Sequence, residues 1–149
     1  MSTPPIRFDR SEYCAANLQW GCNCVPVALA AILGLRLSEV RRFVPEVESG
    51  KGVAVNKIPS VLDRAQVRWR ARGGERFNHG LAVIRFDDVP DPCHCVAVSD
   101  GKLLDTTSVT AGKNWCDVKQ WERKMLPHVA KFLGAKGECR VYRGFEIER

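Results

Sequence analysis

The longest apolar run of the chain covers residues 25–33 and follows Cys24 directly. Its residues are apolar all around a helix, which predicts a helix buried on every side rather than one at the surface. Pro26 suits the first turn, because the N–H that proline lacks would have no partner there. Glycine commonly follows the last residue of a helix, so Gly34 indicates where this helix ends. We therefore expect a central buried helix that starts at Cys24 and ends at Gly34.

The rest of the N-terminal half predicts shorter elements. Residues 1–16 contain two adjacent prolines and are expected to form an irregular lead-in. Ser38 is a suitable N-cap for a second short helix, which Pro45 would end. A third helix is expected over residues 58–65, with Pro59 in its first turn.

From residue 67 onward the pattern changes to that of strands. Alternating apolar and basic residues predict a half-exposed strand, and continuous apolar runs predict buried ones. Asp100-Gly101 between two apolar runs is a strong hairpin signal, residues 87–92 are expected to be a loop, and a helix over 117–133 is expected to break near Pro127. The expected strands cover residues 67–71, 80–86, 93–99, 102–105 and 139–147.

Helices first and antiparallel strands afterwards predict an α+β fold, with the buried helix packed on the sheet. The 149 residues suffice for one core, so we expect a single domain over residues 1–149. Apolar residues make up 45% and charged residues 27%, which is ordinary for a globular protein.

Composition also narrows the partners and the compartment. No apolar run approaches the ~18 residues of a membrane span, so no membrane association is expected. No secretory signal is visible at the N-terminus, which favours the cytoplasm, with signal-less secretion into a host as the alternative. The 23 basic and 17 acidic residues give a net charge of +6, which favours an acidic partner. No nucleic-acid-binding motif accompanies this charge, so no nucleic-acid partner is expected.

Seven cysteines are many for this length, and their odd number rules out complete pairing within one chain. Without a signal peptide, reduced thiols, a metal site or a catalytic thiol are better explanations than a disulfide framework. The cysteines are Cys14, Cys22, Cys24, Cys93, Cys95, Cys116 and Cys139.

Cys24 is the best candidate for a nucleophile. A helix N-terminus stabilises a thiolate through its unpaired N–H groups and its dipole. Cys22 competes for this role but lies two residues earlier, in the connecting loop. Gln19, five residues before Cys24, could combine its side-chain amide with the backbone N–H of Cys24 to hold an oxyanion.

His94 is the best candidate for the base among three histidines. In a hairpin that turns at positions 100–101, residues 94–96 and 105–107 lie roughly opposite each other. Asp105 can therefore reach His94 and fix its tautomer, which completes a Cys-His-Asp set.

Two stretches resemble the active-site motifs of papain-like cysteine peptidases, closest to the C39-like branch. Gln19-Trp-Gly-Cys-Asn-Cys-Val-Pro-Val-Ala-Leu-Ala30 is similar to the helix that carries the nucleophile, and Cys93-His-Cys-Val-Ala-Val-Ser-Asp-Gly-Lys-Leu-Leu-Asp105 to the motif with the base. The resemblance implies a papain-like fold and a hydrolase of peptide, isopeptide or glutamine amide bonds in a protein substrate.

The resemblance also assigns roles to residues. It implies that Cys24 is the nucleophile, His94 the general base and acid, Asp105 the orienting acid and Gln19 the oxyanion donor, and it calls for no cofactor. Gln19 lies one residue closer to the cysteine than is common in that branch, so Asn17 is an alternative donor. A glutamine deamidase or transglutaminase-type acyl transferase would use the same groups.

A zinc-binding structural or interaction module is the main rival hypothesis. Cys22, Cys24, Cys93 and Cys95 form two thiol pairs about 70 residues apart, which could bind zinc through four thiolates. On a strand, Cys93 and Cys95 share one face and His94 points to the other. A site at the helix start would be catalytic if the face of His94 looks at it, and zinc becomes the better reading if the face of the cysteines does.

Overall fold

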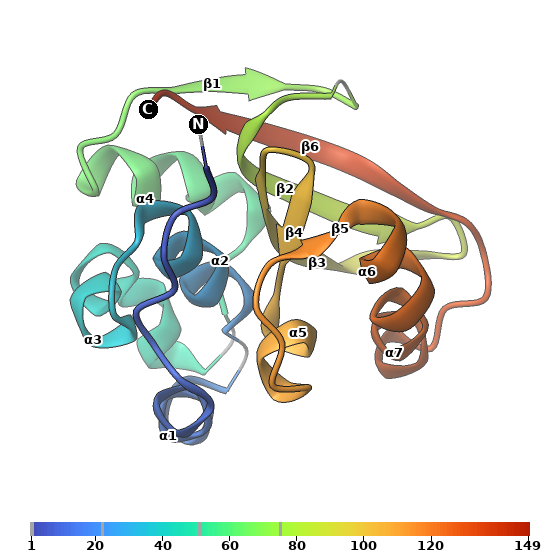
Figure 1. Cartoon of the computed structure of the whole chain (residues 1–149), viewed down its shortest axis with the longest axis horizontal. Helices are drawn as coiled ribbons and strands as arrows, with labels where there is room; N and C mark the ends of the chain where they lie inside the picture. The colour runs from blue at the N-terminus through green and yellow to red at the C-terminus, as the bar shows by residue number, and fades with distance from the viewer. Residues whose placement is uncertain (1, 22, 51, 75) are drawn as a thin grey trace.

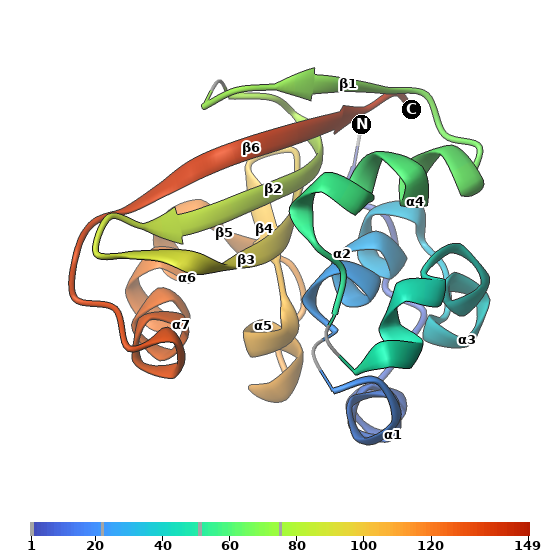
Figure 2. The same cartoon turned by 180° about the vertical axis from the view of Figure 1, so that it is seen from behind.

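A six-stranded antiparallel sheet is the centre of the computed structural model, which describes residues 2–21, 23–50, 52–74 and 76–149. Two views from opposite sides show α1 to α4 grouped at one side of the sheet, α6 and α7 at the other, and α5 between them (Figures 1 and 2). The α+β prediction is confirmed. No helix among these residues combines the length and apolar character that a bilayer crossing requires.

The helices alternate with short 3-10 turns in the N-terminal half. The α-helices are α1 (Arg10–Trp20), α2 (Cys24–Leu33), α3 (Leu37–Val40), α4 (Ile58–Arg64), α5 (Thr106–Thr110), α6 (Val118–Lys124) and α7 (Leu126–Leu133). The 3-10 helices are η1 (Arg41–Phe43), η2 (Pro45–Ser49) and η3 (Val55–Lys57).

All strand pairs of the sheet are antiparallel. The strands are β1 (Trp69–Arg72), β2 (His79–Phe86), β3 (Val89–Ser99), β4 (Lys102–Leu104), β5 (Cys116–Asp117) and β6 (Cys139–Ile147), in the order β1-β6-β2-β3-β4-β5. The C-terminal strand β6 therefore inserts between β1 and β2.

Each face of the sheet contributes to its own hydrophobic core. Alternate side chains of β2 and β3, such as Val83 and Cys95, belong to the core that contains α2. Their sequence neighbours Ile84 and Val96 belong to the core that contains Trp121 and Val129 of α6 and α7. The period of two along a strand thus divides the sheet between the two groups of helices.

The buried central helix is confirmed. Residues 25–32 of α2 are all buried, and Gly34 follows the helix in the left-handed conformation. The third helix is confirmed to within one residue at its end, and the break near Pro127 separates α6 from α7.

Three local expectations were wrong. Residues 10–16 are helical in α1, because Asp9 caps that helix by accepting a hydrogen bond from the Glu12 N–H at 2.8 Å. The second helix begins at Leu37 rather than after a Ser38 cap, although its helical turns do end before Pro45, which starts a separate 3-10 helix. The expected loop over 87–92 is mostly strand, because β3 starts at Val89 after a tight turn.

The predicted hairpin is confirmed and its turn is joined to the C-terminus. Asp100 and Gly101 both have positive φ, as a two-residue hairpin turn requires. The Arg149 guanidinium donates to Ser99 Oγ at 2.6 Å and to Asp100 Oδ2 at 3.0 Å. Ser99 Oγ also lies 3.0 Å from His79 Nδ1, and the tautomer of the histidine decides which of the two groups donates.

His79 is expected to make the protein less stable at mildly acid pH. Burial, helped by the charge of Arg149, lowers the pKa of His79 below the ordinary histidine value of 6.5. The unfolded chain therefore binds this proton more readily, and the free energy of unfolding falls as pH drops below 6.5. Urea unfolding should show that the free energy of unfolding falls less between pH 7.5 and pH 5.5 for His79→Gln than for the unaltered chain. An equal loss in both proteins would contradict the prediction.

Candidate active site

His94 and Asp105 meet as the hairpin predicts. His94 Nε2 lies 2.7 Å from Asp105 Oδ2, with 12% of the histidine side chain exposed and none of the aspartate. The β3–β4 ladder ends at the pair Ala97 and Leu104, so Asp105 is the next residue beyond it. The two side chains are therefore diagonal neighbours on one face of the hairpin.

Asp105 is held by donors from two helices. Its Oδ1 accepts from the Ser108 N–H at 2.9 Å, from Ser108 Oγ at 2.8 Å and from Trp121 Nε1 at 3.1 Å. Burial alone would raise the pKa of Asp105, but its hydrogen bond and charge interaction with His94, together with these donors, keep the pKa below its ordinary value. The carboxylate is therefore ionised at neutral pH and oriented toward the histidine.

Sequence reasoning missed α5 and both helix-borne partners of Asp105. Asp105 does not lie within β4 but caps α5, whose third residue is Ser108. Asp105 is a favoured N-cap residue, and this was the one local signal that could have predicted the helix. Trp121 carried no local signal, because its contact joins residues 16 positions apart across two elements.

Cys24 occupies the first position of α2 and is half-buried. The helix packs against β3, which carries His94, and against α5, which Asp105 caps. Figures 1 and 2 both show the start of α2 and α5 at the same end of the molecule. The structure therefore brings the elements of all three predicted residues together.

The two faces of β3 divide the expected partners of Cys24. Cys95 lies in the core against α2, whereas His94 is paired with Ile84 and belongs to the opposite face. In the described part of the chain, β3 has no ladder partner on the β4 side at residue 94, since that ladder ends at Ala97. By the criterion that the sequence provided, the face of β3 that packs toward α2 is that of Cys95, which favours the zinc hypothesis. The Nδ1 of His94 is the ring nitrogen that does not contact Asp105.

The predicted oxyanion donors lie on α1. Gln19 is exposed in the last turn of that helix, and Asn17 is exposed one half-turn earlier. The role of Gln19 stays a prediction. Cys22, the competing nucleophile, lies outside the described residues.

Two of the remaining thiols, those of Cys116 and Cys139, are poor nucleophiles at neutral pH. Burial and the nearby Asp105 carboxylate raise the pKa of Cys116, and burial raises the pKa of Cys139 to about 11. Cys14 is exposed. The described residues contain no group of three or more potential metal ligands, but the rival zinc site includes Cys22 and the Cys93 side chain, which both lie outside them.

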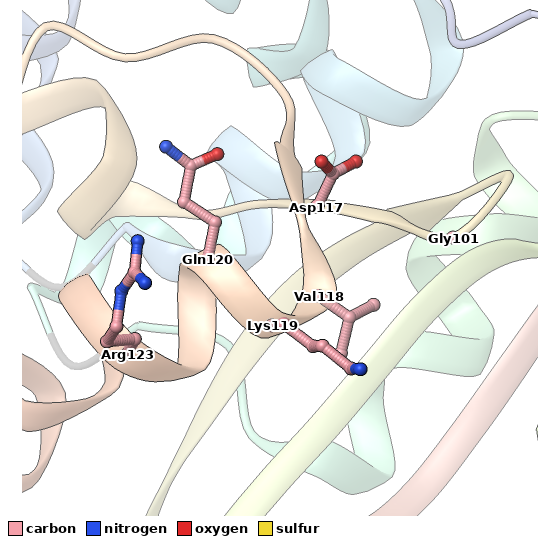
Figure 3. A pocket seen from close by; sticks show the side chains of 6 residues that line it. All are labelled: Gly101, Asp117, Val118, Lys119, Gln120 and Arg123. Atoms are coloured by element: carbon pink, nitrogen blue, oxygen red, sulfur yellow. The ribbon is translucent and has the colours of Figure 1, made fainter.

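Two open pockets lie away from this site. One, of about 620 Å³, is lined by the starts of β1 and β2 and by the end of β6. The other, of about 560 Å³, lies between the Gly101 turn and the outer side of α6. Figure 3 shows Gln120 and Arg123 side by side there, with Lys119 pointing away from them. Since neither lining includes Cys24 or His94, neither pocket marks the candidate site.

No family model, curated protein or solved structure matches this chain. The resemblance to papain-like peptidases therefore remains a prediction from two sequence motifs. The α+β arrangement and the His94–Asp105 pair stand on the structure itself.

Proposed function

We propose that the chain is a cysteine-dependent hydrolase that cleaves a peptide, isopeptide or glutamine amide bond of a protein substrate. The observation that carries the proposal is the buried, ionised Asp105 at 2.7 Å from His94 Nε2. A carboxylate in this position fixes the tautomer of the imidazole and stabilises its protonated form. The placement of Cys24 at the start of the neighbouring α2 supports its role as the nucleophile.

The proposed reaction has two stages. Cys24 gives its proton to His94 Nδ1 and its sulfur attacks the carbonyl carbon of the amide. His94 then protonates the leaving nitrogen, the C–N bond breaks and a thioester remains. Water, deprotonated by His94, attacks the thioester and releases the acid and the thiol. An amine in place of water would give acyl transfer by the same groups.

Limited alkylation tests the nucleophile. At pH 7, substoichiometric iodoacetamide followed by peptide mass spectrometry is expected to modify Cys24 before the exposed Cys14, because a thiol paired with an imidazole at a helix start is the more reactive. The raised pKa values of Cys116 and Cys139 keep those thiols protonated and unreactive. Modification mainly at Cys22 would contradict the assignment.

The zinc hypothesis deserves a separate measurement, since Cys95 and Cys24 both pack at the α2 core. Elemental analysis of protein purified without added metal distinguishes the two functions. Near one zinc per chain would favour the four-thiolate site. A metal-free protein with a reactive Cys24 would favour the hydrolase.

A further inference from the structure

Two buried N–H groups, one on the last residue of α1 and one on the residue before α2, have no hydrogen-bond partner in the described part of the chain. They are Trp20 Nε1 and Asn23 Nδ2. Buried donors are almost always paired, and each exception calls for an explanation. Both groups are donors, so the partner that each lacks is an acceptor such as a carbonyl oxygen.

Asn23 is unusual for its position. It precedes Cys24 as the N-cap of α2 and is 3% exposed, yet its side chain makes no capping hydrogen bond. Asparagine is favoured at N-caps because its side-chain oxygen accepts from the first turn. That reason does not apply here, so stabilisation of the helix start does not account for the buried amide.

We infer that the Asn23 side-chain amide donates a hydrogen bond to the oxyanion formed when Cys24 attacks its substrate. This role rests on the proposed function. The residue directly before the proposed nucleophile carries a buried side-chain N–H group that has no partner among the described residues. Gln19, which the sequence motif suggested, is exposed on α1 instead.

The chemistry of the step requires such a donor. As the S–C bond forms, the π electrons of the carbonyl move to its oxygen, which becomes negative. They return when the C–N bond breaks and the leaving nitrogen takes the proton from His94. A preorganised N–H group that meets the oxygen only in this state accelerates the reaction.

Two reagents separate this role from thiol reactivity. p-Nitrophenyl acetate acylates a thiol through an oxyanion, whereas iodoacetamide alkylates it without one. The rate of ester cleavage is the rate of nitrophenolate release minus the rate measured with Cys24→Ala. The rate of alkylation is measured by mass spectrometry of the peptide that contains Cys24.

For Asn23→Ala we expect the acylation rate to fall about 10-fold or more, with the alkylation rate unchanged. Asn56→Ala, which removes an exposed amide on η3, is the matched control and should change neither rate.

The Tm distinguishes the proposed role from a purely structural one, because only a structural role would make Asn23→Ala less stable. Loss of an unpaired buried donor should leave the Tm of Asn23→Ala equal or higher. A lower Tm with both rates reduced alike, or an unchanged ratio of acylation to alkylation, would overturn the inference. If Asn23→Ala fails to fold, Asn23→Asp keeps the shape of the side chain without its N–H groups, and its ratio of acylation rate to alkylation rate is compared in the same way. If Cys24 of the unaltered chain reacts no faster than Cys14 with either reagent, the proposed function itself fails, and this role with it.

Discussion

His94→Ala is expected to lower the Cys24-dependent cleavage of p-nitrophenyl acetate at pH 7 by about 100-fold. General base catalysis by a positioned imidazole contributes on the order of 10²–10⁴ in rate. The variant leaves Asp105 in place but removes the group that takes the thiol proton. The remaining rate should rise with pH as that of an ordinary thiol does. Stopped-flow release of nitrophenolate between pH 6 and 9 measures both effects.

Two further histidine variants separate catalysis from structure. His94→Gln keeps a side-chain amide that can donate to Asp105, so it should preserve the Tm better than His94→Ala while the rate stays low. His128→Ala removes an exposed histidine of α7 and should cleave the ester as fast as the unaltered chain. If His94→Ala retained the full Cys24-dependent rate, His94 would not be the base.

The hairpin explains why the sequence was sufficient for the His94–Asp105 pair. Asp100-Gly101 sets the turn locally, and the turn sets the register of every residue beyond it. His94 and Asp105 are only 11 residues apart, so a local rule places both. The buried helix was equally predictable, because nine successive apolar residues leave no face for solvent.

The missed elements depend on contacts that span longer distances. In α1 only Ala16 and Trp20 are buried, so the apolar pattern was too weak to predict a helix. β3 extends back to Val89 despite Pro90 and Pro92. Proline is tolerated at a sheet edge, because no neighbouring strand needs its N–H for a ladder hydrogen bond there. The unpaired Asn23 amide is visible only once the surrounding atoms are placed.

The same distinction applies to the papain-like motifs. The motif predicts that Gln19 supports Cys24, and this role stays a prediction, since the structure shows only that Gln19 is exposed at the end of α1. The division of Cys95 and His94 between the two faces of β3 was predictable from the period of a strand, and the structure confirms it. Which of the two faces packs toward α2 could not be predicted, because that depends on how the helix lies on the sheet; it is the face of Cys95.

Asp105→Ala is expected to lower the free energy of unfolding by about 3 kcal/mol or more, the largest stability effect that we predict. The substitution leaves His94 and Trp121 Nε1 without the carboxylate that they contact, and it removes the N-cap of α5. For a chain of this size, such a loss lowers Tm by roughly 6–12 °C. Asp105→Asn keeps the shape and one acceptor oxygen, so it should lose less. Urea unfolding at pH 7 measures all three proteins.

Acid provides the independent check on the charge of Asp105. Because the folded state holds the pKa of this carboxyl below the ordinary aspartate value of 3.8, the ionised form stabilises the fold above that pH. This contribution is lost as pH falls through the lowered pKa of the folded state. The stability difference between the unaltered chain and Asp105→Asn should therefore shrink as the pH is taken from 7 to below 3.8. A difference that stayed constant over this range would mean that shape and hydrogen bonding, rather than charge, explain the role of Asp105 beside His94.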